Sequence, residues 1–180
     1  RTIKSFLQGE RYRYSPISAL YVFGRPQDVA LQMERPSIHE RNHLRLWLAP
    51  MRYDGKHVWI GQISRDIGVR FTFKTWPPVT HKIDPDVDEA MYALLEDLAY
   101  SQQISKLGWI KGVGKASRLN PRYNLTGDPF FTFGLHAVLV FERRPVSFND
   151  IQRLDWEPSP TSTKLKRLTT EKRPDFDEGW

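Results

Sequence analysis

The stretch HLRLWLAPM at residues 43–51, with YDGK at 53–56 and HVWIGQISRD at 57–66, decides the fold of this chain. Leucine alternates with polar or aromatic residues along the first segment, which is the period-two pattern of a half-buried strand. Asp54-Gly55 is a favoured pair for a type I′ turn, and the residues after it suit a returning strand. The stretch therefore predicts a long antiparallel hairpin.

The register of this hairpin predicts which side chains share a face. With Asp54 and Gly55 as the loop, His43 is expected opposite Asp66, Arg45 opposite Ser64 and Trp47 opposite Gln62, unless a bulge intervenes. One face is then polar and aromatic, with His43, Arg45, Trp47, Gln62, Ser64 and Asp66. The other face is apolar, with Leu44, Leu46, Leu48 and Ile63.

A single strong helix is expected after this hairpin. Asp84 is the predicted N-cap and Pro85 the first helical residue. Apolar residues then recur at helical spacing for about four turns: Val87, Ala90, Met91, Leu94, Leu95 and Leu98. Other expected elements are strands at 17–23, 69–73, 107–113 and 131–143, and a short helical segment at 28–33. This order predicts an α+β domain, a mainly antiparallel sheet with one principal amphipathic helix packed on it.

Composition and pattern divide the chain into three parts. Residues 1–14 are predicted to be a poorly ordered arm, 15–145 the α+β domain, and 146–180 a largely irregular or disordered extension in which apolar residues are sparse. The chain begins with Arg1 rather than Met. We therefore expect it to be a piece of a longer protein whose targeting segment is absent.

The composition narrows the classes of function. The 180 residues contain no cysteine, which excludes disulfides, thiolate metal sites and cysteine nucleophiles. No run approaches the roughly 18–20 apolar residues that span a bilayer. The net charge of +6 favours an anionic partner, such as a phosphorylated ligand, a lipid headgroup or nucleic acid. The alternative is a basic surface that serves solubility.

The polar face of the hairpin holds the best candidates for chemistry. His43 and His81 suit acid–base work, with Asp66 orienting His43. Arg41 and Arg45 suit a phosphate or carboxylate group. Gln62, Ser64 and Arg65 complete the candidate ligand-binding set. The alternative for all of them is structural: a His–Asp hydrogen bond and salt bridges that involve no ligand.

A divalent metal is an open alternative, with His81, Asp84 and Asp86 as candidate ligands. The Asp-x-Asp-x-Asp pattern at 84–88 is not a calcium loop, because Glu89 stands where that loop needs glycine. Acidic residues at a helix start more often cap the helix and complement its dipole.

Residues 106–123 are basic and contain aromatics, which suits the backbone of a nucleic acid or the phosphates of a lipid. A solvated connection is the favoured interpretation, and nucleic acid is not the expected partner, because no recognised nucleic-acid motif accompanies the charges. The segment at 112–117 fails as a phosphate loop, since Ala116 follows Lys115 where Ser or Thr is required.

Four ordered motifs resemble the LssY C-terminal domain family: YVFGRPQD at 21–28, RNHLRLW at 41–47, VWIGQISRD at 58–66 and THKIDPDVD at 80–88. The resemblance runs over about residues 17–141. It implies a bacterial, membrane-associated setting, often beside membrane-embedded modules of the lipid phosphatase (PAP2) or DedA type. It implies no catalytic role for any residue.

Together these observations predict an accessory domain of the bacterial cell envelope. Its anion site would be formed by Arg41, His43, Arg45, Asp66 and His81, and would take a small phosphorylated molecule or a phospholipid headgroup. If the domain is an enzyme, phosphoester hydrolysis is the expected reaction. The alternative is a non-catalytic module that binds a protein partner, an anionic membrane surface or nucleic acid.

Overall fold

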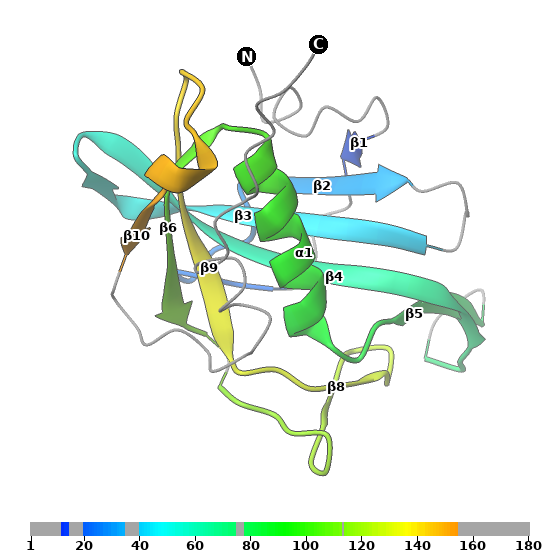
Figure 1. Cartoon of the computed structure of the whole chain (residues 1–180). Coiled ribbons are helices and arrows are strands. Elements are labelled where there is room, and N and C mark those ends of the chain that lie inside the picture. Colours follow the sequence, from blue (N-terminus) through cyan, green and yellow to red (C-terminus); the bar gives the residue numbers. More distant parts are fainter. Residues whose placement is uncertain (1–11, 15–19, 35–39, 75–77, 113, 155–180) are drawn as a thin grey trace.

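The computed structural model describes residues 12–14, 20–34, 40–74, 78–112 and 114–154. An eight-stranded sheet runs in the order β1-β2-β3-β4-β9-β6-β10, with β5 also paired to β4 (Figure 1). Its strands are β1 (Tyr12–Tyr14), β2 (Val29–Glu34), β3 (Glu40–Tyr53), β4 (Lys56–Phe71), β5 (Val79–Ile83), β6 (Ile104–Lys111), β9 (Leu135–Phe141) and β10 (Gln152–Leu154). The other elements are α1 (Val87–Tyr100), η2 (Phe148–Asp150) and a separate pair, β7 (Arg122–Tyr123) and β8 (Pro129–Phe130). Every strand pair is antiparallel except β6 with β10, which confirms the predicted α+β class.

Strand β4 pairs with three other strands of the sheet, β3, β5 and β9. Its first half pairs with β9 at Val58–Gly61, and its second half pairs with β5 at residues 66–71. Strand β3 runs along its other edge. The second half of β4 is therefore flanked by β3 and β5, and this is where the predicted polar residues gather.

The two faces of the sheet have different cores. Helix α1 crosses one face (Figure 1), where its buried leucines, such as Leu94 and Leu98, pack with Leu44 and Leu46. On the opposite face Trp47, which is 0% exposed, packs with Ile60, Val138 and neighbouring apolar side chains. Burial of each such side chain contributes about 1.5–3 kcal/mol. Trp47 thus belongs to the apolar core on the face opposite the helix.

Within the described ranges no helix is long and apolar enough to cross a membrane.

The hairpin turn forms as predicted, but the register does not continue from it. Asp54 and Gly55 both have positive φ (49° and 73°), and Arg52 pairs with His57. A bulge follows, because four steps along β3, from Arg52 to Leu48, correspond to only two along β4, from His57 to Trp59.

The bulge corrects the predicted partners without changing the faces. His43 lies opposite Ser64 rather than Asp66, Arg45 opposite Gln62, and Trp47 opposite Ile60. The register is displaced by two residues, and side chains alternate with a period of two. Each side chain therefore keeps its predicted face, and Asp66 lies diagonal to His43, two residues beyond Ser64 on the same face.

Several predicted elements are wrong in type or position. Residues 28–33, predicted to begin a helix, contribute most of strand β2, because they pair along the free edge of β3. In the described part of the 17–23 strand, Val22 and Arg25 form a bridge around a turn at Phe23. The strand predicted from residue 131 begins at Leu135.

The helix begins two residues later than predicted. Asp86 is the N-cap and accepts a hydrogen bond from the backbone N–H of Glu89 at 3.1 Å. The side chain of Asp84 instead accepts from the backbone N–H of Asp86 at 3.0 Å. Asp84 therefore shapes the turn before the helix rather than capping it.

Both ends of the chain lie largely outside the described residues. Strand β1 lies in the predicted arm, and β10 lies in the predicted extension, where it pairs with β6. The rest of the arm, residues 1–11, and residues 155–180 of the extension are not among the described ranges.

Candidate functional site

A buried carboxylate, Asp66 of β4, lies between two histidines from the neighbouring strands. His43 Nε2 in β3 donates to Asp66 Oδ2 at 2.8 Å, and Nδ1 of His81 in β5 lies 3.9 Å from the same oxygen. Asp66 is only 5% exposed, so water solvates its charge poorly and the neighbouring donors must replace that water. The predicted grouping of these three residues is present in the structure.

Arg45 lies beside this group on the same face. Its Nη1 donates to Ser64 Oγ at 3.1 Å. Burial lowers the pKa of the Arg45 guanidinium, and the nearby charge of Asp66 opposes that effect. Its Nε is buried and has no acceptor among the described residues. A buried donor left without an acceptor costs stability, so Arg45 is not fully explained by packing.

Arg41 reaches the group from the other side. It pairs with Asp66 across β3 and β4. With the amide oxygen of Gln32 turned toward Arg41, that oxygen accepts from Nε at 3.3 Å and from Nη1 at 2.7 Å. Gln32 belongs to β2 and is opposite His43. Four adjacent strands therefore contribute to one polar region, which we call the sheet-face cluster: Gln32, Arg41, His43, Arg45, Gln62, Ser64, Asp66 and His81.

Two nitrogens of the sheet-face cluster have no hydrogen-bond partner in the described part of the chain. Like Arg45 Nε, His81 Nδ1 is buried and has no hydrogen-bond partner. The His81 side chain is nevertheless 41% exposed, against 15% for His43, so the cluster reaches solvent at His81. A solvent-accessible group with an unmatched guanidinium N–H beside an imidazole is chemically suited to an anion.

Three predicted candidates do not join the cluster: Arg65, Asp84 and Asp86. Arg65 alternates with Ser64 and Asp66 along β4, faces the helix side, and its Nη1 lies 3.7 Å from Asp84 Oδ2. Asp86 caps α1. Among the described residues no group of three His, Asp or Glu side chains is arranged to hold a metal ion. The candidate ligands His81, Asp84 and Asp86 are therefore not gathered into a metal centre.

The other histidines lie apart from the cluster. His57 is exposed near the hairpin turn, with Nε2 3.1 Å from Arg52 Nη2, and His39 lies outside the described residues. His136 is buried against Trp47, with ring centroids 6.4 Å apart, and its Nδ1 has no hydrogen-bond partner in the described part of the chain. Burial lowers the pKa of His136.

The lowered pKa of His136 predicts acid sensitivity of the fold. As the pH falls through the ordinary histidine pKa of about 6.5, the unfolded chain binds a proton at this position before the folded chain does. The free energy of unfolding should therefore decrease between about pH 7 and pH 5. Urea titrations should show a smaller decrease for His136→Leu and an unchanged one for His57→Leu. Equal decreases in all three proteins would contradict this role of His136.

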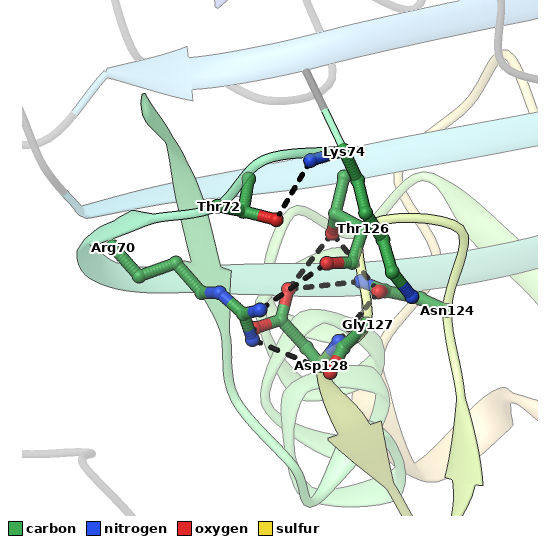
Figure 2. Close-up of polar contacts among 7 residues, drawn as sticks. All are labelled: Arg70, Thr72, Lys74, Asn124, Thr126, Gly127 and Asp128. Atoms are coloured by element: carbon green, nitrogen blue, oxygen red, sulfur yellow. Dashed lines mark hydrogen bonds and ion pairs between the residues drawn. The ribbon is translucent and has the colours of Figure 1, made fainter. Parts of the chain in front are cut away.

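A second polar network escaped the sequence analysis (Figure 2). Asp128, 1% exposed, accepts from Arg70 Nη1 at 2.6 Å, Asn124 Nδ2 at 3.1 Å and Thr126 Oγ1 at 2.9 Å. The backbone N–H of Asp128 donates to Asn124 Oδ1 at 2.8 Å. Asn, Thr, Gly and Asp are turn formers, so the run NLTGD at 124–128 was the available signal for a side-chain-bonded turn.

Asp88 is a further buried acid with a structural role. It accepts from Thr132 Oγ1 at 2.9 Å and from the backbone N–H of Phe133 at 2.7 Å. Burial raises the pKa of Asp88, and these two hydrogen bonds oppose the rise. Asp88 therefore fastens the first turn of α1 to the segment before β9 and does not face the sheet-face cluster.

The family comparison bears on the region that contains the sheet-face cluster. The model of the LssY C-terminus matches residues 1–135. The chain belongs to the LssY C-terminus family. The match covers β2, β3, β4 and β5, and hence every member of the cluster, so the cluster lies within the LssY C-terminus region. No curated protein and no solved structure matches the chain.

Proposed function

We propose that this domain binds a phosphate-bearing anion at the sheet-face cluster. The observation that carries the proposal is a pair of buried nitrogens, Arg45 Nε and His81 Nδ1, that have no hydrogen-bond partner in the described ranges. They belong to β3 and β5, the strands on either side of the β4 segment that carries Asp66. Leaving such groups unpaired in a native fold is costly and uncommon. A bound oxyanion would accept from both.

Phosphate suits this arrangement better than a neutral ligand. A guanidinium presents N–H groups in a fixed fork that matches the oxygens of a phosphate, and Arg45 and Arg41 lie on one strand face. The charge of Asp66 opposes an anion, but His43 donates to it and shields it. Inorganic phosphate, a phosphoester and a phospholipid headgroup share this chemistry. In the membrane-associated setting that the family resemblance implies, the headgroup would be the natural source.

Hydrolysis of a phosphoester is the catalytic form of the proposal, and the His43–Asp66 hydrogen bond favours it. A carboxylate that holds an imidazole in one orientation is the arrangement of a general acid–base pair. A water oxygen would attack phosphorus and pass its proton to His43, the ester P–O bond would break, and the departing alkoxide would take a proton from His81. Arg45 would hold the phosphate oxygens.

A thermal-shift titration tests the binding proposal. Inorganic phosphate, glycerol 3-phosphate and phosphocholine should each raise the melting temperature saturably if the phosphate group is what is recognised. At about 100 times Kd the expected stabilisation is about 2.7 kcal/mol, roughly 5–10 °C for a chain of this size. The shift should disappear in His81→Ala and persist in His57→Ala, which removes the exposed imidazole near the hairpin turn.

The same titration separates a ligand site from structural contacts. If no phosphate compound shifts the wild-type protein, and His81→Ala alone melts several degrees lower, the cluster serves stability. The alternative of a non-catalytic partner-binding module would then replace the proposal. Adding Mg²⁺, Mn²⁺ or Zn²⁺ to the same series tests whether a metal contributes.

A further inference from the structure

One end of the molecule brings two protruding segments together, far from the hairpin turn. The end of β4 carries Arg70, whose guanidinium donates to Asp128 and to the backbone oxygens of Thr126 and Gly127, both at 3.3 Å (Figure 2). Lys74 follows on the same segment, and a Cβ at Gly127 would lie 3.1 Å from its Nζ. The loop between β7 and β8 is therefore fastened to the end of β4.

Large apolar side chains project from both segments into solvent. Phe71 is 84% exposed and Phe73 is fully exposed, while Tyr123 and Leu125 in the fastened loop are 67% and 82% exposed. Single exposed apolar residues are ordinary on protein surfaces, but neighbouring groups of large ones mark interaction sites. Folding of this chain makes little use of these four side chains.

The two chain segments that meet at this end carry basic and no acidic residues. Residues 67–83 and 106–127 contain no Asp or Glu. At this end they contribute Arg70, Lys74 and Arg122, whereas Lys106 pairs with Asp54 at the hairpin turn and Arg118 lies 3.8 Å from Asp86. Asp128, the acid that follows the second segment, is buried and paired with Arg70, while Asp84, which follows the first, lies 3.7 Å from Arg65. An approaching surface therefore meets lysine and arginine beside exposed aromatics.

We propose that this end, which we call the docking tip (Phe71, Phe73, Lys74, Arg122, Tyr123 and Leu125), binds the surface of an anionic lipid bilayer. Aromatic side chains favour the headgroup level of a membrane, and basic residues beside them are attracted to anionic lipids. The aliphatic Leu125 fits this partner, because it can enter the acyl boundary but has no ring on which a base could stack. The inference rests on a surface separate from the sheet-face cluster.

Vesicle co-sedimentation tests the docking tip. The 180-residue chain should bind vesicles of 70% phosphatidylcholine and 30% phosphatidylglycerol, and should bind pure phosphatidylcholine much more weakly. Phe71→Ala/Phe73→Ala should reduce binding to the anionic vesicles about tenfold or more. Lys74→Gln/Arg122→Gln should reduce it about fivefold per removed charge, and added salt should weaken the wild type.

Matched controls remove equivalent groups elsewhere. Tyr21→Ala/Met51→Ala deletes two exposed apolar side chains, and Arg143→Gln/Arg144→Gln removes the same net charge as the tip variant. Both controls should bind vesicles like the wild type. The phenylalanine variant should keep the saturable thermal shift with inorganic phosphate, so loss of the phosphate site and loss of docking can be distinguished. Unchanged melting temperatures in the phenylalanine variant would show that its fold is intact.

Three results would overturn the docking tip. The first is absence of binding to anionic vesicles at low salt. The second is equal loss of binding in the tip variants and the controls. The third is binding that needs Lys74 and Arg122 but not the phenylalanines, because that pattern is bare charge attraction of the kind that serves nucleic acid.

Discussion

Asp128→Ala should destabilise the protein strongly, by about 3 kcal/mol in the free energy of unfolding. The change removes the acceptor of three hydrogen bonds, from Arg70, Asn124 and Thr126. Hydrogen bonds to a charged group contribute about 1.5–3 kcal/mol each. Arg70 is partly exposed, so in the variant water can hydrogen-bond to its guanidinium and reduce the loss of stability. The melting temperature should fall by roughly 6–12 °C.

Urea unfolding followed by tryptophan fluorescence measures this loss. Asp150→Ala is the matched control, because Asp150 is an exposed acid in η2. Its effect should stay within about 0.5 kcal/mol. If both variants unfold at the same urea concentration, the network around Asp128 does not hold the loop to β4. The docking tip requires that this loop is held beside the end of β4, so that inference would then lose its structural support.

Arg45→Met should weaken phosphate binding by about 2–3 kcal/mol, which is thirtyfold to more than a hundredfold in Kd. Within the described part of the cluster, the Arg45 guanidinium and the His81 imidazole are the groups with a buried nitrogen that lacks a partner. The stability of the unliganded protein should change little or increase, because burying the guanidinium charge is costly and methionine fills the space with an apolar chain.

Calorimetric titration with inorganic phosphate and a urea titration of the same samples measure both effects. Arg153→Met, an exposed arginine of β10, is the control and should leave Kd unchanged. Unchanged phosphate binding together with a loss of stability would count against a phosphate site at Arg45. An Arg45→Met variant that binds phosphate normally but unfolds several kcal/mol more easily would make Arg45 a structural residue.

The hairpin shows which structural features the local sequence predicts and which it does not. The Asp54-Gly55 pair predicts the turn because few other residues adopt positive φ, and the alternating leucines predict the faces. The bulge between Leu48 and Arg52 contains Pro50, which cannot donate to the ladder, but a proline does not say how far the register shifts. The predicted pairing of His43 with Asp66 is therefore wrong. The grouping of the two survives because the displacement is an even number of residues.

Other errors arise from tertiary pairing. Residues 28–33 show a helix-like pattern that is too short to decide between helix and strand, and the free edge of β3 makes them a strand. Asp84 and Asp86 are chemically alike as caps, so composition could not choose between them. The position of Arg65 on the helix side, however, follows from the same alternation that places Asp66 on the cluster side.

The approach of His81 to Asp66 is the part of the site that no local pattern predicts. It depends on β5 pairing with the second half of β4 through a bulge at residues 66–68. The network around Asp128 is similar, because Arg70 and Asp128 are 58 residues apart in the chain. Contacts of this kind follow from topology, and only the residue types that can satisfy them are visible in the sequence.

The most direct test is a titration of inorganic phosphate followed by NMR spectra of the imidazole nitrogens of the five histidines. A phosphate site at the sheet-face cluster predicts saturable changes at His43 and His81 that fit one Kd, while His57 near the hairpin turn and His136 behind Trp47 stay unchanged. Absence of saturation, or changes at His57 equal to those at His81, would contradict an anion site at this cluster.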